Sequence, residues 1–146
     1  MSILETYADL TRQVALAVAY WWPVAAVALV VTAIGAYSSS ARLAFKAGGG
    51  LRVQSWPICF PLAILAVASV WACQSLECRP SSPDASPKLA EYALLALLGA
   101  HLVVAGWQVW RRIGARVVTA GLQLLLFWLS LLSTFIGAMS VTNDWL

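Results

Sequence analysis

Four long apolar stretches, separated by short polar connections, are the main constraint on how this chain folds. An α-helix rises about 1.5 Å per residue, so about 20 residues cross the ~30 Å hydrocarbon core of a bilayer. Only helices and closed barrels satisfy their backbone hydrogen bonds inside lipid, and stretches of this length are typical of helices. The sequence therefore predicts four transmembrane helices, at residues 14–37, 56–76, 89–110 and 117–141.

The composition leaves no room for a soluble domain beside these helices. Of the 146 residues, 62% are hydrophobic and only 10% are charged, whereas soluble globular chains carry about 25% charged residues. We expect one all-α domain over residues 1–146, an antiparallel bundle of four transmembrane helices.

The few charges are sorted by sign around the apolar stretches. The connections at residues 38–55 and 111–116 contain Arg and Lys but no acid. All six acidic residues lie in the first segment, in the connection at residues 77–88 and around it, or in the tail. The positive-inside rule then makes the basic connections cytoplasmic and puts both termini outside. We expect an integral protein of a bacterial cytoplasmic (inner) membrane, with periplasmic or extracellular termini. The basic clusters indicate contact with anionic lipid headgroups rather than nucleic acid.

The N-terminal segment permits two arrangements. Ser2 and Glu5 form a capping-box pattern, which predicts a helix start almost at the N-terminus. Residues 3–19 then either lie along the outer interface, with the crossing beginning at the aromatic residues 20–22, or form one helix over residues 3–37 with a kink near Pro23. We prefer the kinked helix and expect no cleaved signal peptide, since no basic region precedes the first apolar stretch.

His101 is the only histidine and lies midway along the third predicted helix, with Gln108 seven residues on and on the same face. Such a residue is a candidate cofactor contact, either a haem ligand or a hydrogen-bond partner of a quinone. Haem would need a second ligand from another chain. In the structural alternative, which we favour, a neutral His101 bonds a neighbouring helix through Gln123 or Thr32.

Two stripes of small or polar residues are candidate helix-packing faces, because small side chains let helices approach closely and hydroxyls bond across the contact. One stripe lies on the fourth predicted helix and the other on the third, opposite His101. A second packing face on the third helix favours contact with a helix of another chain, although ordinary packing within the bundle stays open. The stripes are Gln123, Ser130, Ser133, Gly137 and Ser140 on the fourth helix, and Ala96, Gly99, Val103 and Gly106 on the third.

Catalytic groups are not apparent. The predicted helices contain no Asp, Lys or Arg, and Glu91 lies only in the first turn of the third. Neither a nucleophile paired with a base nor a metal-binding cluster is visible, so we expect no catalytic residues, no metal and no required cofactor. Cys73 and Cys78, at the outer end of the second helix, are a disulfide candidate in an oxidising compartment.

These features favour a non-catalytic accessory subunit that packs against and stabilises a larger membrane protein complex. Its expected partners are membrane lipids and either other integral membrane subunits or further copies of the chain. A redox-associated subunit in which His101 contacts haem or quinone is one alternative, and a small oligomeric channel or carrier is another.

Overall fold

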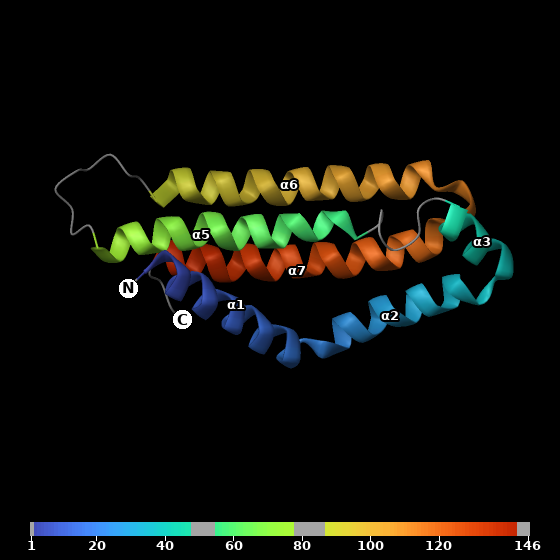
Figure 1. Cartoon of the computed structure of the whole chain (residues 1–146), viewed down its shortest axis with the longest axis horizontal. Helices are drawn as coiled ribbons and strands as arrows, with labels where there is room; N and C mark the ends of the chain where they lie inside the picture. The colour runs from blue at the N-terminus through green and yellow to red at the C-terminus, as the bar shows by residue number, and fades with distance from the viewer. Residues whose placement is uncertain (1, 48–54, 78–86, 143–146) are drawn as a thin grey trace.

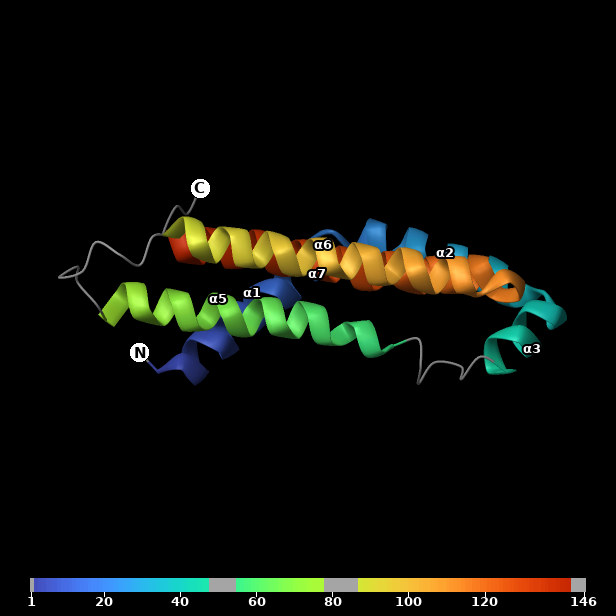
Figure 2. The same ribbon diagram turned by 90° about the horizontal axis from the view of Figure 1, so that it is seen from above.

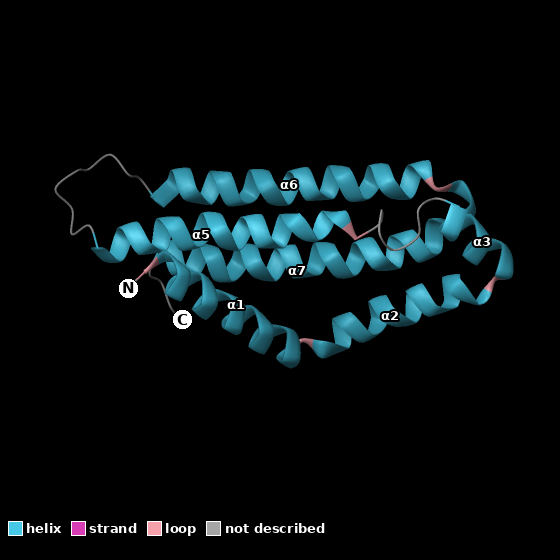
Figure 3. Cartoon of the chain, in the orientation of Figure 1, coloured by secondary structure: helices cyan, strands magenta, loops and turns pink. Residues whose placement is uncertain are grey.

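The computed structural model describes residues 2–47, 55–77 and 87–142, and nearly all of these residues are helical. No strand occurs among these residues (Figure 3), so the predicted all-α fold class is confirmed. The helices are α1 (Ile3–Tyr20), α2 (Trp22–Tyr37), α3 (Ser39–Ala47), α5 (Cys59–Glu77), α6 (Pro87–Arg111) and α7 (Arg116–Thr142), with short 3-10 turns η1 (Trp56–Ile58) and η2 (Ile113–Ala115).

Three helical segments, containing α5, α6 and α7, are each long and apolar enough to cross a membrane, and the bent pair of α1 and α2 brings the number to four if it is one span. The ends of α5, α6 and α7 lie within three residues of the predicted ones. Prolines explain two of the helix starts. Pro87 is the first residue of α6, where its missing N–H costs no hydrogen bond, and Pro57 lies in the 3-10 turn η1 that leads into α5.

Helix α7 is the centre of the bundle, since α1, α2, α5 and α6 all pack against it (Figures 1 and 2). At the end of the bundle that holds the N-terminus, one apolar cluster joins four helices. It includes Leu10 and Val14 of α1, Ile64 of α5, Leu94 of α6 and Ile136 of α7. The amphipathic α1 is therefore part of the bundle and is held by its buried face.

The first segment begins as predicted and then breaks. Ser2 caps α1, and the Ser2 and Glu5 side chains each bond the other's backbone N–H, so the capping box is confirmed. Trp21 leaves the helical conformation just before Pro23, which cannot donate to the preceding turn. The two helices meet at a bend of 72°. The chain thus follows the kinked path, but with a full break in the helix at Trp21.

The aromatic residues at this bend do not mark an end of the bundle. Tyr20, Trp21 and Trp22 are all exposed, and the bend lies about midway along the molecule (Figure 1). The alternative arrangement, in which the crossing begins at residues 20–22, would put these residues at an end of the bundle, whereas the structure has them near its middle (Figure 1).

The two ends of the bundle differ in what they carry. The start of α1 and the end of α7 lie at one end, and α3 and η2 lie at the other (Figures 1 and 2). Helix α3 packs against η2 so closely that a Cβ atom on Gly114 would lie 2.8 Å from the Cβ of Ala44. The basic residues of α3 and of the α6–α7 connection are thereby gathered at one end, as four crossings require.

Candidate functional site

The polar residues of α6 and α7 meet in a regular antiparallel register. His101 contacts Ser130, Gln108 contacts Gln123, and Leu94 lies over Gly137, and in each pair the residue numbers add up to 231. Successive pairs are seven residues apart on both helices, which is two helical turns. The tight connection through η2 fixes this register, because it leaves no slack between the two helices.

His101 is enclosed by three side chains from two other helices. Its Nδ1 atom lies 2.6 Å from the hydroxyl oxygen of Ser130, in a fully buried contact. The ring stacks on Phe60 of α5, with centroids 4.9 Å apart and planes 13° apart. Phe127 meets the ring edge-on at 5.8 Å. The imidazole therefore joins α5, α6 and α7 at one point.

The environment of Nε2, the second ring nitrogen of His101, indicates which neutral tautomer has the lower free energy. Within the described part of the chain, Nε2 is buried and has no hydrogen-bond partner. A buried N–H without an acceptor is more costly than an empty lone pair. We infer a neutral ring in which Nδ1–H donates to the Ser130 oxygen and Nε2 carries the lone pair.

His101 contacts Ser130, and neither of the partners that we predicted from the sequence. The expected partners were Gln123 and Thr32, but the register places Gln123 level with Gln108, to which its Nε2 donates over 2.8 Å. The Thr32 hydroxyl instead donates to the Ala28 carbonyl of its own helix, over 2.7 Å. Gln108 and His101 do share a face of α6, as their spacing predicted, but each contacts a different residue of α7.

The surroundings of His101 do not fit a haem. An axial ligand needs an open nitrogen, whereas His101 has no exposed surface and Phe60 covers one face of its ring. The sequence has no second histidine to complete the coordination. The described residues also contain no group of three His, Cys, Asp or Glu side chains that could hold a metal ion. His101 in this conformation joins helices, and it offers no coordination site.

The small-residue stripe of α7 faces the inside of the bundle. Gln123, Ser130, Ser133 and Gly137 are buried and Ser140 is half-buried. At Gly137 an added Cβ would lie 2.9 Å from the Cβ of Ala68, so this glycine lets α5 approach closely. The stripe therefore packs against helices of the same chain.

The stripe of α6 faces outward. Ala96, Gly99, Val103 and Gly106 are all exposed, and no atom of another described helix lies within 4 Å of a Cβ built on Gly99 or Gly106. Among the described residues, no other helix packs against the two glycines of this face.

Two close contacts were not singled out from the sequence. A Cβ on Gly35 of α2 would lie 2.8 Å from the backbone nitrogen of Val118, and one on Gly121 of α7 would lie 2.9 Å from the backbone nitrogen of Thr32. The spacing of Ala28, Thr32 and Gly35 at intervals of four and three residues was the available signal.

The disulfide candidate stays a prediction. Cys73 is buried in α5, but Cys78 lies outside the described residues.

No protein-family model, curated protein or solved structure matches this chain.

Proposed function

We propose that this protein is a non-catalytic subunit of a membrane complex, and that the small-residue face of α6 packs against a helix of a partner subunit or of another copy. The observation that carries the proposal is the outward stripe of Ala96, Gly99, Val103 and Gly106, which are all exposed, with open space beside both glycines.

The uneven burial of the helices supports this choice of face. Only 22% of the apolar window of α6 is buried within the chain, against 44% for the windows of α5 and α7. Association of helices in lipid depends on close backbone approach, since lipid tails cover large apolar side chains as well as a protein does. Small residues at the exposed positions of α6 provide that approach.

The chemistry of the described residues also supports a packing role. Two contacts between polar side chains join α6 and α7 of the same chain, one between His101 and Ser130 and one between Gln108 and Gln123. The buried stripe of α7 packs against helices of the same chain, and the exposed stripe of α6 is left for contact with a helix of another chain. This difference in burial supports the proposed subunit role.

Co-purification from native membranes tests the proposal. The wild-type chain is expected to elute with a partner or as an oligomer, and Ala96→Leu is expected to lose that species because its side chain separates the two backbones. Ala66→Leu is the matched control, since Ala66 is an exposed alanine on α5. A wild-type protein that elutes only as a single chain, or an equal loss in both variants, would contradict the proposal.

A further inference from the structure

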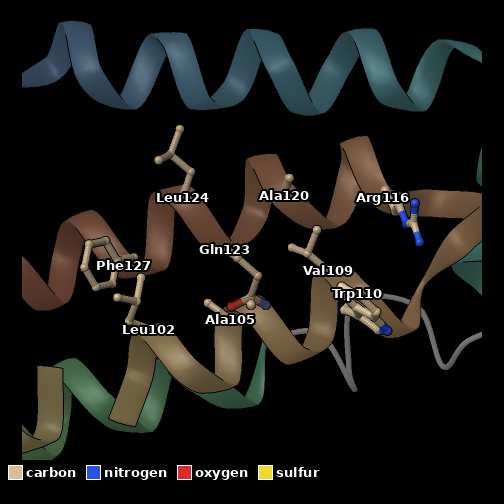
Figure 4. A pocket seen from close by; sticks show the side chains of 10 residues that line it. Leu102, Ala105, Val109, Trp110, Arg116, Ala120, Gln123, Leu124 and Phe127 are labelled. Carbon is tan, nitrogen blue, oxygen red and sulfur yellow. The ribbon is translucent and has the colours of Figure 1, made fainter. Parts of the chain in front are cut away.

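A groove runs along the outside of the α6–α7 pair. It has a volume of about 620 Å³, and all the residues that line it come from these two helices (Figure 4). The small residues Ala105, Gly106 and Ala120 create the space of the groove. The larger side chains of Leu102, Leu124 and Phe127 also line it.

The groove has one basic end and one apolar end. Arg116 and Trp110 lie together at the end near the α6–α7 connection, and Leu102 and Phe127 lie at the opposite end (Figure 4). The only acid in the sequence of α6 and α7 is Glu91, which lies in the N-terminal part of α6, at the opposite end of the hairpin from Arg116. The exposed guanidinium is therefore free to meet a negative charge from outside the hairpin.

The length of the groove matches one leaflet of a membrane. Arg116 and Phe127 are eleven residues apart on α7, which at about 1.5 Å per residue is roughly 16 Å. Half of a hydrocarbon core about 30 Å thick is about 15 Å. A lipid whose headgroup lies at Arg116 would thus extend its chain as far as Phe127, near the middle of the bilayer.

The geometry points to a binding site for an anionic phospholipid. Its phosphate would lie at Arg116, beside the indole of Trp110, and one acyl chain would follow the apolar part of the groove between α6 and α7. Basic pockets between transmembrane helices are suited to anionic headgroups, and Arg is suited to phosphate because it offers several N–H donors in one plane. The occupant is a lipid of the leaflet on the Arg111–Arg116 side.

This inference does not depend on the proposed subunit role. The groove shares Gly106 with the outward stripe of α6, but Arg116 and the α7 lining are not part of that stripe. Lipid binding can therefore be measured on the purified chain without any partner.

Thermal unfolding of the purified protein in a neutral detergent tests the site. At a tenfold excess over its Kd, phosphatidylglycerol is expected to raise the Tm by about 3 °C. Phosphatidylcholine with the same acyl chains is expected to give a clearly smaller shift, and glycerol 3-phosphate alone is expected to give none. The shift should be lost in Arg116→Gln and retained in Arg116→Lys. Arg111→Gln is the matched control, because Arg111 is an exposed arginine of the same connection that does not line the groove.

Labelling of the wild-type protein supplies a readout that does not depend on how the variants fold. Phosphatidylglycerol with a photoreactive acyl chain is expected to label residues 102–110 and 120–127. Equal Tm shifts with both phospholipids, a shift with glycerol 3-phosphate alone, or equal losses in Arg116→Gln and Arg111→Gln would each overturn the site. Labelling spread evenly over α2 and α5 would do the same.

Discussion

At the scale of single residues, two side-chain hydrogen bonds join α6 and α7, His101 with Ser130 and Gln108 with Gln123. Hydrogen bonds between transmembrane helices contribute about 0.6 kcal/mol on average and up to about 1.7 kcal/mol. The bond between His101 and Ser130 belongs at the upper end of this range, because it is short and fully buried and its loss strands a second polar nitrogen.

Replacing Ser130 by Ala is therefore expected to lower the free energy of unfolding by about 1–2 kcal/mol. Ser140→Ala is the control, since the Ser140 hydroxyl donates only to the Ile136 carbonyl of its own helix, and its removal should cost less than about 0.5 kcal/mol. Reversible unfolding in mixed micelles measures both. Equal costs for the two serines would show that the contact across α6 and α7 contributes nothing.

The same scale shows where sequence reasoning failed. His101 was correctly recognised as a polar residue between helices, but its partner was sought by residue type alone. The tight α6–α7 connection sets the register, and counting outward from its centre pairs residue 101 with 130 and residue 108 with 123. The enclosing rings of Phe60 and Phe127 come from packing of three helices, and no local pattern indicates them.

At the scale of helices, glycine decides how closely α2 lies to α7. Gly35 and Gly121 each face the backbone of the opposite helix, so neither position has room for a methyl group. Gly99 on α6 has open space around it instead. The same residue type therefore has opposite effects at these positions, and helix propensity alone would treat them alike.

Gly121→Ala is expected to destabilise the protein by about 1–3 kcal/mol, because α2 must move away from α7. Gly99→Ala should be neutral or stabilising by up to about 1 kcal/mol, since alanine favours the helix and meets no described atom. Unfolding of both variants under the same micelle conditions is the measurement. Stabilisation by Gly121→Ala would contradict the close packing of α2 on α7.

The break between α1 and α2 can be measured as a distance. Spin labels at Ala8 and Ala33, both exposed, lie on helical arms about 20 and 18 Å long from Trp21. With the bend of 72°, their backbones should be about 30 Å apart, against about 37 Å in a straight helix. Pulsed electron spin resonance resolves this difference, and a distribution centred near 37 Å would show that the helix is continuous.

Pro23 allowed us to predict where the helix bends, but not the angle between α1 and α2. A proline removes one hydrogen bond and favours a kink of any angle. The angle is set by the contacts of α1, whose buried residues Thr6, Leu10 and Val14 hold it against the other helices. Such contacts between distant segments are absent from the local pattern, whereas helix type and ends follow directly from apolar length and caps.

At the scale of the whole molecule, the two ends of the bundle carry different charges. Helix α3 contributes Arg42 and Lys46 next to η2, which is flanked by Arg112 and Arg116. Each basic residue near an anionic surface contributes about 1 kcal/mol. Both clusters favour the same orientation, so we predict that this end lies in the cytoplasm and that the termini lie outside.

The most direct test of this account is labelling of single cysteines by a membrane-impermeant maleimide, in a background where Cys59, Cys73 and Cys78 are replaced. One cysteine replaces Ala47 at the end of α3, where it is exposed at the basic end. The other replaces Ser82, in the chain between α5 and α6. In intact cells, Ser82→Cys should be labelled and Ala47→Cys should be labelled only after the membrane is opened. The reverse pattern would contradict the orientation, and labelling of both positions in intact cells would contradict the four crossings.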